Sequence, residues 1–413
     1  MHRSTPSLTL LLFVVVSAPL AAADDAKDFF FRKGDRIVFL GDSITEQYQY
    51  STDIELYLTT RFPGGDMTFL NAGIGGDTAT GGANRFAQHV LAEKPTALTI
   101  DFGMNDGGYG GFNPGAAKNY INKTEDMLKA AQKAGVRVAL ISPNAVEVRA
   151  RPNLKTYLET QQKFYAPLKQ LADKYKVPFV DQYAVTRKVL NNIAANDVNV
   201  HPFPDGVHTN GPGGLLMAHT ILVGLHAPAV VSDVTIDAAD KKSKPTDCTI
   251  EELNVSSDGI SFQRKDKALP IPIQSDWRPI LPFVNDLKDL NYYGLTVTGL
   301  NGGKYLLNID GKKVGEYTAE ELSKGVNLGN LGVGPLFEQG QAVLKMINEK
   351  NNLVHSRFRG VVMFNAPDWL ADVARERKPA ELIKRMEKIQ SLQEAIYNKA
   401  RPTTHRFELK EMK

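Results

Sequence analysis

The sequence contains a single cysteine, Cys248, among 413 residues. One thiol excludes an intramolecular disulfide, so packing alone must stabilise the fold, and no cysteine near the N-terminus is available for lipid attachment. The eight histidines show no H-E-x-x-H run and no paired Cys/His spacing, so we expect no metal site. A dinucleotide fingerprint and a P-loop lysine are also missing, and we expect no cofactor. The absence of a G-x-S-x-G elbow argues against an α/β-hydrolase fold.

A large excess of charge of either sign is absent as well. Lysine and arginine number 49 and aspartate and glutamate 46, which gives a net charge of +3, and the two signs are interleaved along the chain. This pattern gives no indication of a nucleic-acid partner. The hydrophobic share of 42% is ordinary for a soluble globular protein, and the length is sufficient for two domains.

Only one long apolar run occurs, at residues 8–20, and it is too short for a comfortable membrane span. It follows His2 and Arg3 and precedes three alanines at 21–23. These features predict a signal peptide over residues 1–23 and an exported protein, periplasmic or extracellular, with no transmembrane segment after cleavage. A buried N-terminal helix is the alternative interpretation.

Residues 30–228 alternate short apolar runs with longer amphipathic stretches. This alternation predicts an α/β domain with a doubly wound parallel sheet, because continuous apolar runs suit strands that are covered on both faces. The expected strands are 37–40, 67–70, 97–100, 136–141 and 177–180, and the expected helices are 53–61, 83–92, 116–134, 154–175 and 213–225.

The pattern changes after Pro228. Residues 229–330 are expected to form a β-rich accessory region, with hairpins around Gly302-Gly303 and around Asp310-Gly311. Residues 331–413 are expected to form a helical C-terminal region, in which Pro379 opens a helix with an apolar stripe for packing. The stripe consists of Leu382, Met386, Ile389, Leu392 and Ile396.

Residues with catalytic potential follow the expected strands. In an open α/β sheet, ligands bind beyond the carboxyl ends of the strands, so these positions are the informative ones. Taken alone, each segment has an ordinary interpretation as a helix N-cap, a turn or a structural histidine. The segments are 41–45 (GDSIT), 71–78 (NAGIGGDT), 103–106 (GMND) and 204–210 (PDGVHTN).

Together these segments contain the groups that acyl transfer needs. A serine hydroxyl such as that of Ser43 is a weak nucleophile until a histidine takes its proton, and the histidine needs a carboxylate to orient it. Asp205 and His208 are three residues apart, which lets the carboxylate reach one imidazole nitrogen while the other faces Ser43. The developing oxyanion also needs donors, which a glycine N–H, an asparagine side chain and the Ser43 N–H are able to supply.

The four segments resemble the conserved blocks of the SGNH hydrolases, also called the GDSL lipase/acylhydrolase superfamily. The resemblance covers residues 36–225 and implies a flavodoxin-like three-layer α/β/α domain with ester hydrolase activity. It implies Ser43 as nucleophile, Gly76 and Asn105 as oxyanion-hole residues with the Ser43 N–H, and Asp205 with His208 as the acid and base. Ile44 stands where the family name implies leucine, and Gly73 and Gly75 are alternatives to Gly76.

Export and nearby aromatic residues favour a carbohydrate ester as substrate, and short acyl groups such as acetyl as the part removed. Tyr48, Tyr109 and Phe112 follow the catalytic segments and are candidates to stack on sugar rings, and Asp42 is a fourth candidate substrate contact. A lipid-directed, lysophospholipase-like esterase is the first alternative. The second is a carbohydrate-binding or cell-surface protein in which the esterase-like domain is secondary. The sequence leaves the oligomeric state open.

Overall fold

The computed structural model describes residues 29–196 and 198–412. The predicted signal peptide at 1–23 lies outside these residues. A five-stranded sheet in the order β2-β1-β3-β4-β5 forms the centre of the N-terminal half, and every neighbouring pair is parallel. Its strands are β1 (Arg36–Gly41), β2 (Thr68–Asn71), β3 (Ala97–Asp101), β4 (Arg137–Ile141) and β5 (Phe179–Val180).

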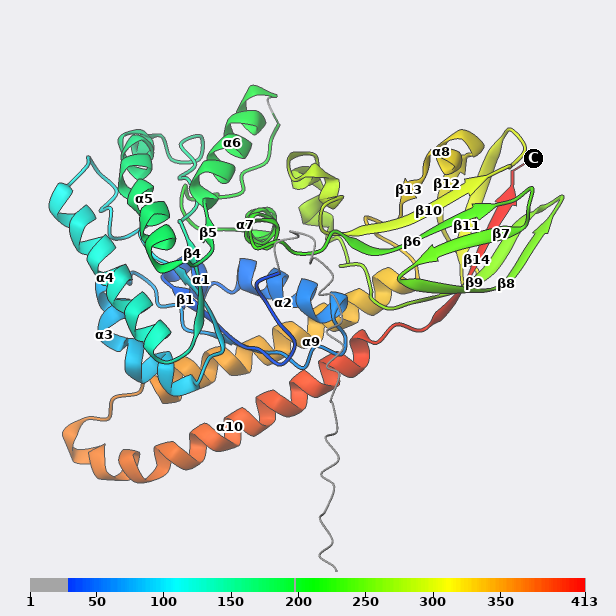
Figure 1. The fold of residues 1–413 in the computed structure, drawn as a ribbon. Coiled ribbons are helices and arrows are strands. Elements are labelled where there is room, and N and C mark those ends of the chain that lie inside the picture. Colours follow the sequence, from blue (N-terminus) through cyan, green and yellow to red (C-terminus); the bar gives the residue numbers. More distant parts are fainter. Residues whose placement is uncertain (1–28, 197, 413) are drawn as a thin grey trace, which may run out of the picture.

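Helices cover both faces of this sheet (Figure 1). Along the chain they are α1 (Ser43–Glu46), α2 (Gln49–Arg61), α3 (Ala79–His89), α4 (Pro114–Lys133), α5 (Lys155–Tyr175), α6 (Gln182–Ala195) and α7 (Gly211–Gly224). Helices α3, α4 and α5 pack side by side, and α2 packs against α7. The predicted three-layer α/β/α fold is therefore confirmed.

The sequence pattern missed helix α6. Its N-cap is Asp181, which directly follows the two-residue strand β5, and the side chain of Asp181 accepts a hydrogen bond from Ala184 N–H. The helix is rich in β-branched residues and asparagine, which have modest helix propensity. Packing of residues such as Val189 and Ile193 in the core overrides that propensity.

The β-rich region consists of two further sheets. One has the order β13-β10-β6-β7 and the other, antiparallel throughout, the order β12-β11-β14-β9-β8. The strands are β6 (Val230–Asp237), β7 (Lys242–Thr246), β8 (Cys248–Ser256), β9 (Gly259–Asp266), β10 (Tyr292–Thr298), β11 (Lys304–Ile309), β12 (Lys312–Thr318), β13 (Val326–Asn327) and β14 (Thr404–Glu411), and α8 (Ala319–Lys324) follows β12. Their apolar faces form a second core.

One of the two predicted hairpins exists. Strands β11 and β12 pair antiparallel across Asp310-Gly311. The hairpin predicted at Gly302-Gly303 is wrong, because β10 pairs with β6 and β13 whereas β11 pairs with β12 and β14. That turn carries the chain from one sheet to the other. The local pattern of apolar residues does not encode which strands β10 and β11 pair with.

Two long helices connect the β-rich region with the N-terminal domain. Figure 1 shows α9 (Pro335–Arg357) running from the β-rich sheets along the α/β domain, and α10 (Ala371–Ala400) returning to strand β14. Lys350 Nζ of α9 lies 2.7 Å from Glu55 Oε1 of α2, and both side chains are fully buried. Residues of α9 and α10 share the core of the α/β domain. We call α9, the π-helical turn η5 (Phe358–Val362) and α10 the C-terminal hairpin.

Two features of this hairpin differ from the sequence prediction. Pro379 does not open the helix but lies inside α10, which begins at Ala371. The apolar stripe begins only after the proline because the preceding turns are on the surface. Strand β14 falls in the segment expected to be helical, and it inserts between β9 and β11. No helix in the described part of the chain has the length and apolar character needed to cross a membrane.

Candidate active site

Three of the chemistry-bearing segments follow β1, β2 and β3, so they meet at the carboxyl edge of the sheet. Ser43 is the first residue of α1 rather than its N-cap. The N-cap is Asp42, whose Oδ1 accepts a hydrogen bond from Ile44 N–H at 2.9 Å. This arrangement leaves the Ser43 N–H in the first helical turn, where backbone donors have no intrahelical acceptor.

The fourth segment brings a histidine to this edge. His208 Nε2 lies 2.8 Å from Ser43 Oγ, and His208 Nδ1 lies 2.6 Å from Asp205 Oδ2. The second oxygen of Asp205 accepts hydrogen bonds from the backbone N–H groups of Val207 and His208, at 2.9 and 2.7 Å. The structure thus brings the three sequence-predicted residues into one hydrogen-bonded chain.

The electrostatics of Asp205 favour its ionised form. Partial burial alone would raise its pKa, but the hydrogen bonds from the His208 ring, the His208 N–H and the Val207 N–H outweigh that effect and lower the pKa. A carboxylate that stays ionised holds the imidazole with its Nδ1 proton directed to Asp205, which leaves Nε2 free to accept a proton from Ser43.

The loop that carries Asp205 and His208 is held by a buried glutamate. Glu147 accepts hydrogen bonds from Phe203 N–H at 3.0 Å and pairs with His201 Nδ1 at 2.6 Å. Its backbone N–H also donates to the carbonyl of Gly206. Gly206 has a φ of +89°, and a Cβ there would lie 2.7 Å from the side chain of Arg151, so glycine is required at this position.

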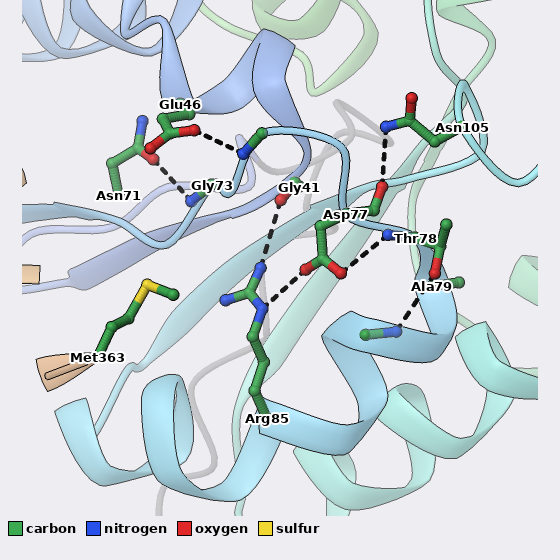
Figure 2. Close-up of polar contacts among 12 residues, drawn as sticks. Gly41, Glu46, Asn71, Gly73, Asp77, Thr78, Ala79, Arg85, Asn105 and Met363 are labelled. Carbon is green, nitrogen blue, oxygen red and sulfur yellow. Dashed lines mark hydrogen bonds and ion pairs between the residues drawn. The ribbon is translucent and has the colours of Figure 1, made fainter. Parts of the chain in front are cut away.

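The loop after β2 is fixed by side chains from several elements (Figure 2). Asn71 Oδ1 accepts from Gly73 N–H, Glu46 Oε2 from Gly75 N–H, and Asp77 Oδ1 from Thr78 N–H. Among the described residues, Gly76 is the one position from 72 to 79 whose backbone N–H has no acceptor. Gly76 is exposed and has a φ of +73°. Of the three candidate glycines, it therefore offers the free donor.

The amide of Asn105 is oriented by its neighbours. Its Nδ2 donates to the backbone carbonyl of Asp77 at 2.9 Å, and its Oδ1 accepts from the Tyr109 hydroxyl at 2.9 Å. The distance from Nδ2 to Asp42 Oδ2 is 3.5 Å, beyond the usual range for a strong hydrogen bond. One hydrogen of the Asn105 amide therefore remains available to a ligand.

Arg85 is a site residue that sequence reasoning missed. It lies on α3 and is buried, its Nε donates to Asp77 Oδ2 at 2.8 Å, and its Nη2 reaches the Gly41 carbonyl at 3.4 Å. Figure 2 shows this guanidinium between the end of β1 and the loop after β2. The available signal was an arginine directly before the core residue Phe86 in an expected helix.

Asp42 is not placed to contact substrate, which corrects the sequence prediction. Its side chain is buried, and its oxygens face Ile44 N–H and the Asn105 amide. Burial raises its pKa to about 7, and the neighbouring carboxylates Asp106 and Asp77 act in the same direction against the Ile44 hydrogen bond and His208. Asp42 caps α1 because an aspartate at the N-cap satisfies an otherwise unpaired N–H.

The candidate aromatic residues separate into two groups. Tyr109 and Phe112 are exposed, and the Tyr109 ring also packs at 5.2 Å against Tyr157. Tyr48 lies instead against His355 of α9, with ring centroids 5.9 Å apart and an interplanar angle of 86°. The Tyr48 side chain is half-buried, and its hydroxyl is buried and has no partner among the described residues. Its contact with substrate stays a prediction.

No group of three or more His, Cys, Asp or Glu side chains within residues 29–196 and 198–412 is arranged to hold a metal ion. The polar groups at the carboxyl edge of the sheet instead form a serine, histidine and aspartate chain beside free N–H donors. In chemical terms this site is able to activate a hydroxyl and to stabilise an oxyanion.

Comparisons with known proteins find a family model, a related sequence and similar folds. Residues 39–213 match the sequence model of the GDSL-like Lipase/Acylhydrolase family. An arylesterase of Vibrio mimicus is 26% identical over 205 residues, which are 48% of this chain and 90% of that protein. A gut microbial diltiazem-metabolizing enzyme has 24% identity and a TM-score of 0.81, covering 94% of this chain and 99% of that chain. An acetylxylan esterase from Geobacillus stearothermophilus has 20% identity and a TM-score of 0.41, and the match covers 48% of this chain and 97% of that chain.

The likeness to the diltiazem-metabolizing enzyme extends over the β-rich region and the C-terminal hairpin, so the whole architecture occurs in another solved structure. The family match falls on the α/β domain and contains all four chemistry-bearing segments; the first three residues of β1 lie outside it. Residues 39–213 of this chain therefore form a GDSL-like lipase/acylhydrolase domain, and the comparisons support an esterase.

Proposed function

We propose that Ser43 is the nucleophile, His208 the general base and Asp205 the orienting acid of a carboxylic ester hydrolase. The observation that carries this proposal is the continuous chain from Ser43 Oγ through both His208 nitrogens to Asp205, with separations of 2.8 and 2.6 Å. Serine needs such a base because its hydroxyl is a weak nucleophile at neutral pH.

The reaction proceeds in two halves. In the first, Ser43 Oγ attacks the ester carbonyl carbon while His208 Nε2 takes the hydroxyl proton. Collapse of the tetrahedral intermediate breaks the bond to the alkoxy oxygen, which leaves as the alcohol with the proton from Nε2. In the second half, water attacks the acyl group on Ser43, gives a proton to Nε2, and the carboxylic acid is released as Ser43 regains its proton.

The developing negative charge is proposed to bind three donors. They are the Ser43 N–H, the Gly76 N–H and the remaining hydrogen of Asn105 Nδ2. The absence of another acceptor for the Gly76 N–H among the described residues supports this assignment. Preorganised donors of this kind typically lower the barrier by about 3 kcal/mol each.

We infer that the substrate is a short-chain ester, with an acetylated carbohydrate as the natural class. The exposed rings of Tyr109 and Phe112 support this inference, because Tyr109 also hydrogen-bonds Asn105 and so lies beside the donors. The name of the Vibrio mimicus relative makes aryl esters suitable assay substrates. Export of the protein rests on the predicted signal peptide at 1–23.

Labelling with a fluorophosphonate, followed by peptide mass spectrometry, tests the nucleophile. We expect the adduct on Ser43 and its loss in His208→Ala; an adduct on another serine would refute the assignment. A panel of acetylated polysaccharide, p-nitrophenyl acetate and lysophospholipid tests the substrate class. Preference for lysophospholipid would favour the lipid-directed alternative, and a biological role retained by Ser43→Ala would favour the binding-protein alternative.

A further inference from the structure

We propose that His355 and Arg359 of the C-terminal hairpin are positioning residues for the loop after β2, residues 72–78, which we call the oxyanion loop. They act on it through Glu46. This proposal rests on the function proposed above, in which Gly76 is an oxyanion donor. It assigns to the hairpin, which lies outside the family match at 39–213, a part in catalysis.

Glu46 joins three parts of the molecule. It is the last residue of α1, one turn after the nucleophile Ser43. Its Oε2 accepts the Gly75 N–H at 2.5 Å, and its Oε1 lies 3.5 Å from His355 Nε2 and 3.3 Å from Arg359 Nε. Figure 2 shows the Glu46 carboxylate directed at this loop. The contacts with His355 and Arg359 hold one carboxylate oxygen and so direct the other toward the loop.

The direction of the Gly75 peptide matters because Gly76 is next in the chain. The two N–H groups belong to successive peptide planes that share the Gly75 Cα, and the hydrogen bond from Asp77 N–H to the Ile74 carbonyl, at 3.1 Å, closes the turn that contains both planes. Gly75 and Gly76 are both exposed, so core packing does not fix them. The hydrogen bond to Glu46 therefore limits where the Gly76 N–H points.

The hairpin itself is a rigid support. Buried Lys350 of α9 pairs with Glu55 of α2, and Asn351 donates to Thr52 of the same helix at 3.0 Å. His355 follows one turn later and also packs edge-on against Tyr48. The hairpin thus contacts Glu46 and Tyr48, the residues on either side of Gln47. These contacts come from a long helix that is fixed to α2.

Kinetic constants of the full-length protein with p-nitrophenyl acetate test this proposal. His355 and Arg359 are about half exposed, at 45% and 43%, so we expect their replacement by alanine to leave the melting temperature close to that of the control. The double variant H355A/R359A is expected to lower kcat by roughly three- to tenfold with little change in KM, because donors are misplaced and not removed. The matched control is R385A, a cation of the same hairpin that pairs with Glu381 and Ser356.

A double-mutant cycle with E46Q distinguishes positioning from general support of the fold. Glutamine retains an acceptor for Gly75 but loses the negative charge that pairs with Arg359 and the carboxylate that His355 contacts, so H355A/R359A is expected to have no further effect on kcat in the E46Q background. R359K in the H355A background is expected to recover most of the rate. An unchanged kcat in H355A/R359A, or additive effects in the cycle, would overturn the proposal. Loss of activity in S43A together with either result would leave the proposed function intact, whereas an active S43A would overturn both.

Discussion

Arg85 and Asp77 form a buried ion pair beneath the oxyanion loop, with Nε and Oδ2 separated by 2.8 Å. The same guanidinium reaches the carbonyl of Gly41, and the backbone carbonyl of Asp77 accepts the Asn105 amide. One helix residue thereby connects the segments that hold Ser43, Gly76 and Asn105, the proposed nucleophile and oxyanion donors. The relative positions of these segments depend on this pair as well as on the sheet.

Replacement of Arg85 by alanine should reduce both stability and rate. It leaves Asp77 without its partner in a largely buried position, and losses for broken buried pairs are about 3 kcal/mol or more. We expect the free energy of unfolding in urea to fall by about that amount and kcat to fall on the order of tenfold. The control is Arg375→Ala, whose ion pair with Asp372 is exposed and is expected to contribute less than about 0.5 kcal/mol. Equal stability of the two variants would contradict this account.

Removal of the nucleophile or base should abolish turnover without unfolding the protein. Ser43→Ala and His208→Ala are each expected to lower kcat by about a thousandfold or more, and the double variant should be no worse than either, because the two groups act as a unit. Turnover of p-nitrophenyl acetate with matched circular dichroism spectra measures this. Multiplicative losses in the double variant would show that the two residues act independently.

Tyr109 allows hydrogen bonding and stacking to be separated. Tyr109→Phe retains the ring but removes the donor to Asn105 Oδ1, so we expect kcat to fall by about three- to tenfold for every ester, the equivalent of a hydrogen bond of about 1 kcal/mol. Tyr109→Ala should in addition weaken acetylated carbohydrate more than p-nitrophenyl acetate. Phe112→Ala, at an exposed ring without this hydrogen bond, should show the second effect alone.

The same losses of Tyr109→Ala on both substrates would remove the argument for sugar stacking. A Tyr109→Phe variant with wild-type kcat would show that Asn105 keeps its orientation through Asp77 alone, since that carbonyl holds the amide nitrogen. The Tyr109→Ala comparison uses the ratio of kcat/KM between two substrates, so differences in the amount of active protein cancel.

The sequence predicted the fold of the α/β domain because its signals are local. Apolar runs such as 97–100 mark strands that are buried on both faces, and parallel strands place the residues that follow them at one edge. Ser43 and Asn105 follow strands β1 and β3 in this way. His208 follows no strand directly, and it was predicted from its residue type, its spacing from Asp205 and the resemblance of the four segments to a known family.

Contacts from distant parts of the chain were beyond such reasoning. Nothing nearby in the sequence indicates that His355 of α9 packs against Tyr48. The roles of Glu46 and Arg85 likewise depend on partners that only the folded chain brings together. The pairing of β10 with β6 could not be predicted either. The apolar alternation of β10 fits pairing with any strand and does not indicate one that lies far away in the sequence.

Asp42 should make stability depend on pH in a direction opposite to that of a salt-bridged aspartate. Burial raises its pKa from the ordinary 3.8 to about 7, so between these values the unfolded chain loses this proton while the folded protein keeps it. The stabilisation is complete below about pH 3.8 and is lost as the pH rises through about 7, by at most about 1.4 kcal/mol per pH unit.

Asn at this position cannot ionise and retains the acceptor for Ile44 N–H. The stability of Asp42→Asn relative to wild type, measured by urea unfolding from pH 5 to 8, should therefore increase with pH. Asp372→Asn, which removes an exposed carboxylate, controls for the loss of one charge. A relative stability that stays constant or decreases over this range would mean that Asp42 is already ionised in the folded protein at pH 5.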